Sequence, residues 1–165
     1  MTYEYNGPKN QYNGHPRTIV IVSGYFIYMH VGHKRYLEAA KQLAGSDGEL
    51  WVIVNNDEQQ KDKKGEVIMN ADDRMEIVDS IKYVDRVILS IDRDRSQCRT
   101  LEAIVKYNPG KLTFIFANGG DRCSGEIPES DLCRKKQIKM VDGVGGDIKA
   151  DSSTRLIAAR DTGEK

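Results

Sequence analysis

The sequence predicts an α/β fold in which a doubly wound parallel sheet of five strands carries helices on both faces. Short runs rich in β-branched residues alternate with segments whose apolar residues recur at helical spacing. Glycine, asparagine or aspartate follows several of these runs, as expected where a strand ends in a turn. Strands that alternate with helices form parallel sheets with right-handed crossovers, because each helix returns the chain to the edge where the next strand begins.

The first half of the chain gives two strands, two helices and a loop between them. The apolar run 18–22 predicts the first strand, and apolar residues at helical spacing over 31–45 predict a helix that a glycine ends. A second strand is expected at 50–54. The polar and basic stretch 59–66 predicts a mobile loop. Asn70 is the expected N-cap of the next helix, since two aspartates follow it in the first turn.

The second half continues this alternation with shorter and weaker signals. Its apolar runs and helical periods follow the same rules as those before them. The expected elements are a strand at 87–89, a helix at 96–107, a strand at 112–117, a loop or short helix at 127–133, a fifth strand at 137–141 and a last helix at 152–160.

Composition limits the class of protein and its compartment. The chain carries 25 Lys and Arg against 25 Asp and Glu, and this zero net charge argues against nucleic-acid partners. No apolar run approaches the roughly 20 residues of a membrane helix, and the first residues lack the pattern of a signal peptide. The three cysteines form no Cys-x-x-Cys pair, which disfavours a disulfide framework and a zinc knuckle. We therefore expect a cytoplasmic protein without membrane or nucleic-acid partners.

The chain is expected to consist of a tail and one domain. Residues 1–16, rich in Tyr, Asn and Gly, predict a flexible N-terminal tail, and residues 17–161 predict the domain. Ligands of open parallel sheets bind beyond the carboxyl ends of the strands. Segments 23–33, 118–121 and 151–154 fall at that edge, so a ligand site is expected where these distant segments meet.

Two histidines stand at the start of the first expected helix. His30 and His33 are three residues apart, so both rings lie on one side of the helix, and Gly32 lets a ligand approach the backbone. The N–H groups and dipole of a helix start suit an anion such as a triphosphate, to which imidazoles donate hydrogen bonds. Two other interpretations stay open from these residues alone, namely histidines with a purely structural role and a pair of metal ligands.

The segment around these histidines resembles the nucleotidylyltransferase superfamily of the cytidylyltransferase-like type. The family pattern is Gly-Thr-Phe-Asp-x-x-His-x-Gly-His, and the matching residues are Gly24, Phe26, His30, Gly32 and His33. Tyr25 stands in place of the family threonine, and Ile27 in place of its aspartate. The resemblance implies a Rossmann-like fold and an enzyme that binds a nucleoside triphosphate.

Further segments extend the resemblance over roughly Arg17 to Arg160. The segment 151–156 is similar to the family's Ile-Ser-Ser/Thr-Thr-x-Ile, whose hydroxyl and N–H groups hold phosphates, and 118–121 resembles its Gly-Gly-Asp turn. By this resemblance the catalytic residues are His30, His33, Lys63 and Arg74. The implied nucleotide-binding residues are Gly24, Tyr25, Phe26, His30, Gly32, His33, Lys64, Gly119, Gly120, Asp121, Lys149, Ser152, Ser153 and Thr154. Lys61 is implied to bind the acceptor, and no residue is implied to be a metal ligand.

The resemblance implies transfer of CMP from CTP, or of AMP from ATP, to a small phosphorylated acceptor such as a polyol or sugar phosphate, with release of pyrophosphate. Mg²⁺ is expected to arrive with the nucleotide, and a homodimer is common among relatives. The loss of the aspartate at Ile27 leaves an alternative, a non-catalytic nucleotide sensor of the same fold. A metal-binding scaffold built on the two histidines and an interaction module built on the tail are further alternatives.

Overall fold

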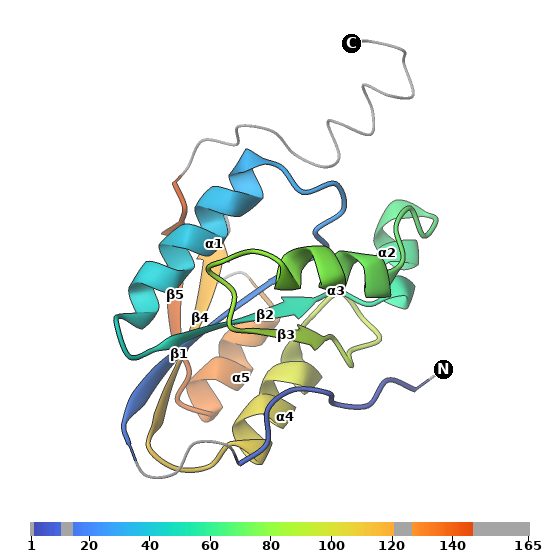
Figure 1. The fold of residues 1–165 in the computed structure, drawn as a ribbon. Helices are drawn as coiled ribbons and strands as arrows, with labels where there is room; N and C mark the ends of the chain where they lie inside the picture. The colour runs from blue at the N-terminus through green and yellow to red at the C-terminus, as the bar shows by residue number, and fades with distance from the viewer. Residues whose placement is uncertain (1, 11–14, 121–126, 147–165) are drawn as a thin grey trace.

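Five parallel strands form the centre of the molecule, in the order β3-β2-β1-β4-β5 (Figure 1). The structure, a computed structural model, describes residues 2–10, 15–120 and 127–146. The strands are β1 (Arg17–Gly24), β2 (Glu49–Val54), β3 (Arg86–Leu89), β4 (Leu112–Gly119) and β5 (Lys139–Val144). The helices are α1 (Val31–Ala44), α2 (Asp57–Lys64), α3 (Ala71–Asp79), α4 (Cys98–Tyr107) and α5 (Glu129–Lys135). The expected α/β fold and all five expected strands are confirmed.

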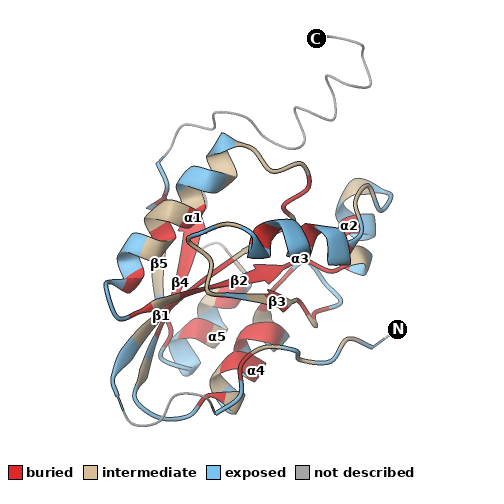
Figure 2. Ribbon diagram, in the orientation of Figure 1, coloured by how far each residue is buried: buried red, intermediate tan, exposed pale blue. Residues whose placement is uncertain are grey.

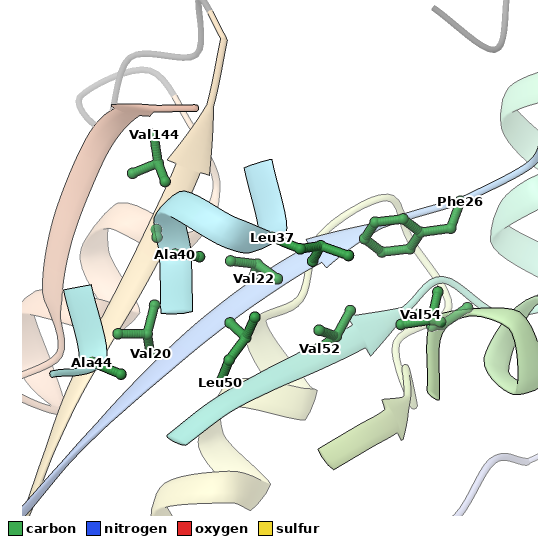
Figure 3. Packing of buried hydrophobic residues seen from close by; sticks show 12 residues of the cluster. Val20, Val22, Phe26, Leu37, Ala40, Ala44, Leu50, Val52, Val54 and Val144 are labelled. Atoms are coloured by element: carbon green, nitrogen blue, oxygen red, sulfur yellow. The ribbon is translucent and has the colours of Figure 1, made fainter. Parts of the chain in front are cut away.

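The sheet separates two hydrophobic cores, because successive side chains of a strand point to opposite faces. On one face, Val20 and Val22 of β1 pack with Leu37 of α1, in a cluster that extends to Phe26 at the carboxyl edge of the sheet (Figure 3). On the other face, Ile19 and Ile21 of β1 pack in one cluster with residues of α4 and α5. The buried residues accordingly lie along the strands and on the inner sides of the helices (Figure 2). Helices therefore cover both faces of the sheet, as the doubly wound fold requires.

The helix α2 replaces most of the loop that the sequence predicts over 59–66. The segment lacks an apolar stripe, yet both of its ends are capped. At its start, the Asn56 side chain accepts a hydrogen bond from the Gln59 N–H at 2.9 Å, and the Gln59 side chain accepts one from the Asn56 N–H at 3.0 Å. Gly65 ends the helix in the left-handed conformation, with φ 84°. The prediction of a loop was wrong because it searched for apolar periodicity and overlooked this capping box.

Two buried amides attach α2 to the loop between β3 and α4. The side chains of Asn56 and Gln59 are fully buried. Their NH₂ groups donate to four carbonyl oxygens of that loop at 2.7–3.1 Å, those of Ser90, Asp92, Asp94 and Ser96. Hydrogen bonds therefore hold α2 in place where an apolar face would hold an ordinary amphipathic helix.

The remaining helices agree with the sequence within a few residues. Asn70 caps α3 as expected, since its side chain accepts from the Asp73 N–H at 2.9 Å. The segment 127–133, expected to be a loop or short helix, contains most of α5. The expected last helix over 152–160 lies outside the described residues. In the part of the chain that is described, no helix is long and apolar enough to cross a membrane.

The N-terminal segment, described over residues 2–10, lies against β3 and α4, whereas the sequence predicts a flexible tail. The Tyr5 ring stacks on Tyr107 of α4, with centroids 5.2 Å apart and planes 6° from parallel. The Asn6 side chain accepts a hydrogen bond from the backbone N–H of Leu89, in strand β3, at 3.1 Å. This segment therefore makes both aromatic and polar contacts with the domain.

Candidate active site

The sheet has its switch point between β1 and β4, which pair in parallel at its centre. After β1 the chain enters α1 on one face, and after β4 it reaches α5 on the other (Figure 1). Such a divergence leaves a crevice beyond the carboxyl ends of the two strands, which is where ligands of doubly wound sheets bind.

The first turn of α1 is capped by its two histidines. His30 Nδ1 accepts a hydrogen bond from the Gly32 N–H at 3.1 Å, and His33 Nδ1 accepts one from the His30 N–H at 3.2 Å. The two ring centroids are 4.0 Å apart. A neutral imidazole that accepts at Nδ1 carries its proton on Nε2. The cap therefore selects the tautomer in which each neutral ring is a hydrogen-bond donor at Nε2.

His33 stays neutral at physiological pH. Its ring packs 5.3 Å from the buried Phe26 ring. Burial, with a smaller contribution from neighbouring His30, lowers the pKa of His33 to about 4. His33 is thus suited to donate a hydrogen bond to an anionic oxygen without itself bringing a charge.

The loop between β1 and α1 has an unusual backbone. Phe26 and Tyr28 each have a φ of 52°, in the left-handed region that non-glycine residues seldom adopt. A Cβ on Gly24 would lie 2.9 Å from the Phe26 ring, so the glycine is needed for that ring to fold over the strand end. Ile27, in the position of the family aspartate, is fully buried. This position therefore serves packing in the present chain, and no carboxylate lies there.

Arg74 of α3 joins the loops at this edge of the sheet. Its guanidinium is fully buried and donates to the carbonyl oxygens of Tyr25, Asn55 and Met69 at 2.7–2.8 Å. It also pairs with the Asp57 carboxylate at 3.0 Å. These bonds connect the ends of β1 and β2 to the starts of α2 and α3. Arg74, a predicted site residue, thus lies at this edge of the sheet. Its guanidinium binds three backbone carbonyl groups and the Asp57 carboxylate.

The three lysines predicted to contact phosphates all lie in α2. Lys63 Nζ stands 4.6 Å from the centroid of the Tyr25 ring and lines a cavity of about 340 Å³ beyond the ends of β1 and β2. Lys61 is exposed and Lys64 half-buried. Because α2 is a helix anchored by buried amides, these lysines extend from a fixed element and not from the expected mobile loop.

The end of β4 lies under the first turns of α1. Tyr36 Oη donates to the Ala117 carbonyl oxygen at 2.5 Å, and a Cβ on Gly119 would lie 3.2 Å from the Tyr36 ring. Gly119 and the half-buried Gly120, two residues predicted to bind nucleotide, therefore lie near the helix that carries the histidines. The other predicted nucleotide-binding residues, namely Asp121, Lys149, Ser152, Ser153 and Thr154, lie outside the described residues.

Three further residues line the cavity and belong to no motif that predicts a site. Arg95 and Gln97 come from the loop between β3 and α4, and Glu129 is the first residue of α5. Among the described residues, no group of three or more His, Cys, Asp or Glu side chains is arranged to hold a metal ion.

Comparison with known proteins identifies the family. The cytidylyltransferase-like family model matches residues 21–141. A FAD synthase of Korarchaeum cryptofilum is 41% identical over 125 residues, which are 74% of this chain and 78% of that protein. The bifunctional protein HldE of Campylobacter concisus is 31% identical over 133 residues, 79% of this chain and 25% of that protein.

A solved structure shares the fold. The lipopolysaccharide core biosynthesis protein of Thermoplasma volcanium superposes with a TM-score of 0.59 at 24% identity, over 82% of this chain and 99% of that one. This likeness concerns the fold alone. Together with the His-x-Gly-His cap at the strand edge, the family match shows that the chain belongs to the cytidylyltransferase-like family and is a nucleotidyltransferase.

Proposed function

We propose that the protein transfers AMP from ATP to FMN, producing FAD and pyrophosphate. The observation that carries this proposal is the histidine cap at the start of α1, in a chain that is 41% identical to a FAD synthase over most of that protein's length. The sequence favours a polyol or sugar phosphate as acceptor. The similarity to FAD synthase favours FMN in its place, and sugar-phosphate transfer is the second candidate, supported by the similarity to HldE.

In the proposed reaction, a phosphate oxygen of FMN attacks the α-phosphorus of ATP in line. A bond forms between these two atoms, and the bond from the α-phosphorus to the bridging oxygen breaks as pyrophosphate leaves. No covalent intermediate with the protein is needed, so the protein contributes alignment and stabilisation of charge. Mg²⁺ supplies further charge neutralisation when it arrives on the triphosphate, as it commonly does with few protein ligands.

Some of the site residues donate hydrogen bonds or charge to the phosphates, and another holds the loops that carry them in position. His30 and His33 donate from Nε2 to phosphate oxygens that gain charge in the transition state. Lys63 offers a point charge beside Tyr25 at the cavity. Arg74 acts as a positioning residue, because it binds the carbonyl groups of the loops that carry these side chains.

A matrix of substrates tests the proposal. The full chain is incubated with ATP, CTP, GTP or UTP and with FMN, glycerol 3-phosphate or a heptose phosphate, in the presence of Mg²⁺. Pyrophosphate release is measured in every combination, and FAD is identified by chromatography. We expect FAD from ATP and FMN at a rate that exceeds every other pair at least tenfold. Faster transfer to another acceptor overturns the assignment of FMN. Triphosphate binding without pyrophosphate release in any pair supports the alternative of a non-catalytic nucleotide sensor.

A further inference from the structure

The cavity of about 340 Å³ lies on the sheet face that α4 and α5 cover, beyond the ends of β1 and β2. Its walls include Lys63 of α2, Arg95 and Gln97 of the loop before α4, and Glu129 at the start of α5. The histidine cap belongs to α1, which packs on the opposite face. A volume at the lower end of the range for small-molecule sites suits one substrate and not both together.

Two residues that line the cavity each carry a buried oxygen atom that has no partner among the described residues. Gln97 is 2% exposed and Glu129 is 1% exposed. Glu129 Oε1 accepts a hydrogen bond from the Gln97 N–H at 2.8 Å. Glu129 Oε2 and Gln97 Oε1 accept none from any described residue. Buried acceptors without donors are rare in folded proteins because each loses its hydration without compensation.

Two basic side chains line the exposed part of the same cavity. Lys63 is exposed, with its ammonium over the Tyr25 ring. Arg95 is also exposed, and its Nε donates to the Asp62 carboxylate at 2.6 Å. The cavity therefore has two different ends. Its deep end is lined by Glu129 and Gln97, whose buried oxygens are hydrogen-bond acceptors, and its open end carries the Lys63 ammonium, which attracts a phosphate.

We infer that Glu129 and Gln97 are specificity-determining residues, which receive hydrogen bonds from O–H or N–H groups of the acceptor substrate while its phosphate lies at the open end near Lys63. This inference rests on the proposed nucleotidyl transfer and names the chemical class of its acceptor. The class is a phosphate monoester whose body carries hydrogen-bond donors, and FMN belongs to it through its ribityl hydroxyls and the N3–H of its ring. An acceptor without donors in its body, such as choline phosphate, leaves both oxygens unpartnered and is rejected.

The variant Glu129→Gln tests this role without creating a cavity. The hydrogen bond from the Gln97 N–H requires an oxygen at the position of Oε1, so the new amide must place its NH₂ group where Oε2 stood. This NH₂ group then faces an O–H or N–H group of the acceptor substrate, and two hydrogen-bond donors cannot pair. We expect the KM for FMN to rise about tenfold to a hundredfold, while the KM for ATP and kcat change less than twofold. The matched control is Glu102→Gln on the exposed side of α4, which we expect to leave all three constants unchanged.

Thermal unfolding of the substrate-free protein separates recognition from a structural role. Glu129→Gln keeps the size of the side chain and its bond to Gln97, so we expect its Tm to equal that of the wild type. A lowered Tm with an unchanged KM for FMN shows a purely structural residue and overturns the inference. Gln97→Met is the second variant, and the same loss of FMN affinity is expected from it.

The outcomes distinguish this inference from the proposed function. FMN binding is followed directly by its fluorescence, which needs no turnover. Transfer to FMN with an unaltered KM in Glu129→Gln overturns the inference and leaves the proposed function standing. If a donor-bearing sugar phosphate replaces FMN as substrate and its KM rises in the variant, the proposed function fails and the inference holds.

Transfer to choline phosphate at a rate comparable with FMN overturns the inference. FMN methylated at N3 keeps the ribityl hydroxyls but lacks the ring N–H. Weaker binding of this analogue to the wild type therefore assigns the hydrogen bond to N3–H, and unchanged binding assigns it to the hydroxyls.

Discussion

The starts of α1 and α2 solve the same structural problem with different chemistry. Both helices begin at the carboxyl edge of the sheet with a capping box. In this motif the side chains of the N-cap residue and of the third helical residue each accept a hydrogen bond from the other's backbone N–H. In α2 the pair is Asn56 and Gln59, two fully buried amides that also bind the neighbouring loop. In α1 the pair is His30 and His33, both only partly buried, which cap through Nδ1.

The difference shows how a cap acquires a function. An amide pair is sufficient to begin a helix, as α2 demonstrates, so capping alone does not call for histidine. An imidazole that caps through one nitrogen holds its second nitrogen in a fixed direction and tautomer. The α1 cap therefore combines helix initiation with preorganised donors, whereas the α2 cap is directed entirely to the fold.

The largest expected effect comes from removing one of these donors. We expect His33→Ala to lower turnover about a hundredfold or more, because a fixed donor to the charged transition state is lost. Steady-state pyrophosphate release measures it, with circular dichroism to show that the fold is retained. An unchanged rate removes His33 from the mechanism.

His33→Gln is the matched variant for that experiment. Gln59 shows in α2 that a glutamine side chain at the third helical position accepts from the N-cap N–H. His33→Gln should therefore restore the stability of the cap while turnover stays below that of the wild type. Equal losses of stability in the Ala and Gln variants would contradict the capping role.

The second effect concerns the amide cap and appears in stability. Gln59→Ala removes three hydrogen bonds at 2.7–3.1 Å from a fully buried site. We expect the free energy of unfolding to fall by about 2–3 kcal/mol, since net contributions near 1 kcal/mol per bond are typical. Urea unfolding measures the change. The control Gln42→Ala, on an exposed position of α1, should alter stability by less than about 0.5 kcal/mol.

The third and smallest effect is the pH dependence of the histidine cap. The pKa of His33 is lowered from 6.5 in the unfolded chain to about 4 in the folded protein. The unfolded state therefore binds more protons between these values, and stability is lost as the pH falls through this window. We expect the free energy of unfolding to drop by about 2 kcal/mol more between pH 7 and pH 5 in the wild type than in His33→Gln. Equal slopes in the two proteins would show that His33 titrates normally.

The sequence predicts features that depend on local pattern and misses those that depend on tertiary contacts. Alternating β-branched runs predict all five strands, and the Asn70 cap predicts α3. The short motif around His30 and His33 predicts the edge where they lie. Gln97 and Glu129 are not predicted as site residues because their burial depends on the packing of α4 beside α5, which no spacing in the sequence records. The sequence places Arg74 in a helix, and only the structure shows that it binds backbone carbonyls.

The position of residues 2–10 has a consequence for handling the protein. Strand β3 ends the sheet on one side, and an uncovered edge strand invites pairing with a strand of another molecule. The Asn6 side chain occupies the Leu89 N–H of that strand, and the Tyr5 stack on Tyr107 holds the segment beside it. The N-terminal segment thus covers part of the β3 edge, at Leu89. An affinity tag at the amino end that displaces Tyr5 from Tyr107, or removal of these residues, would uncover this part of the β3 edge.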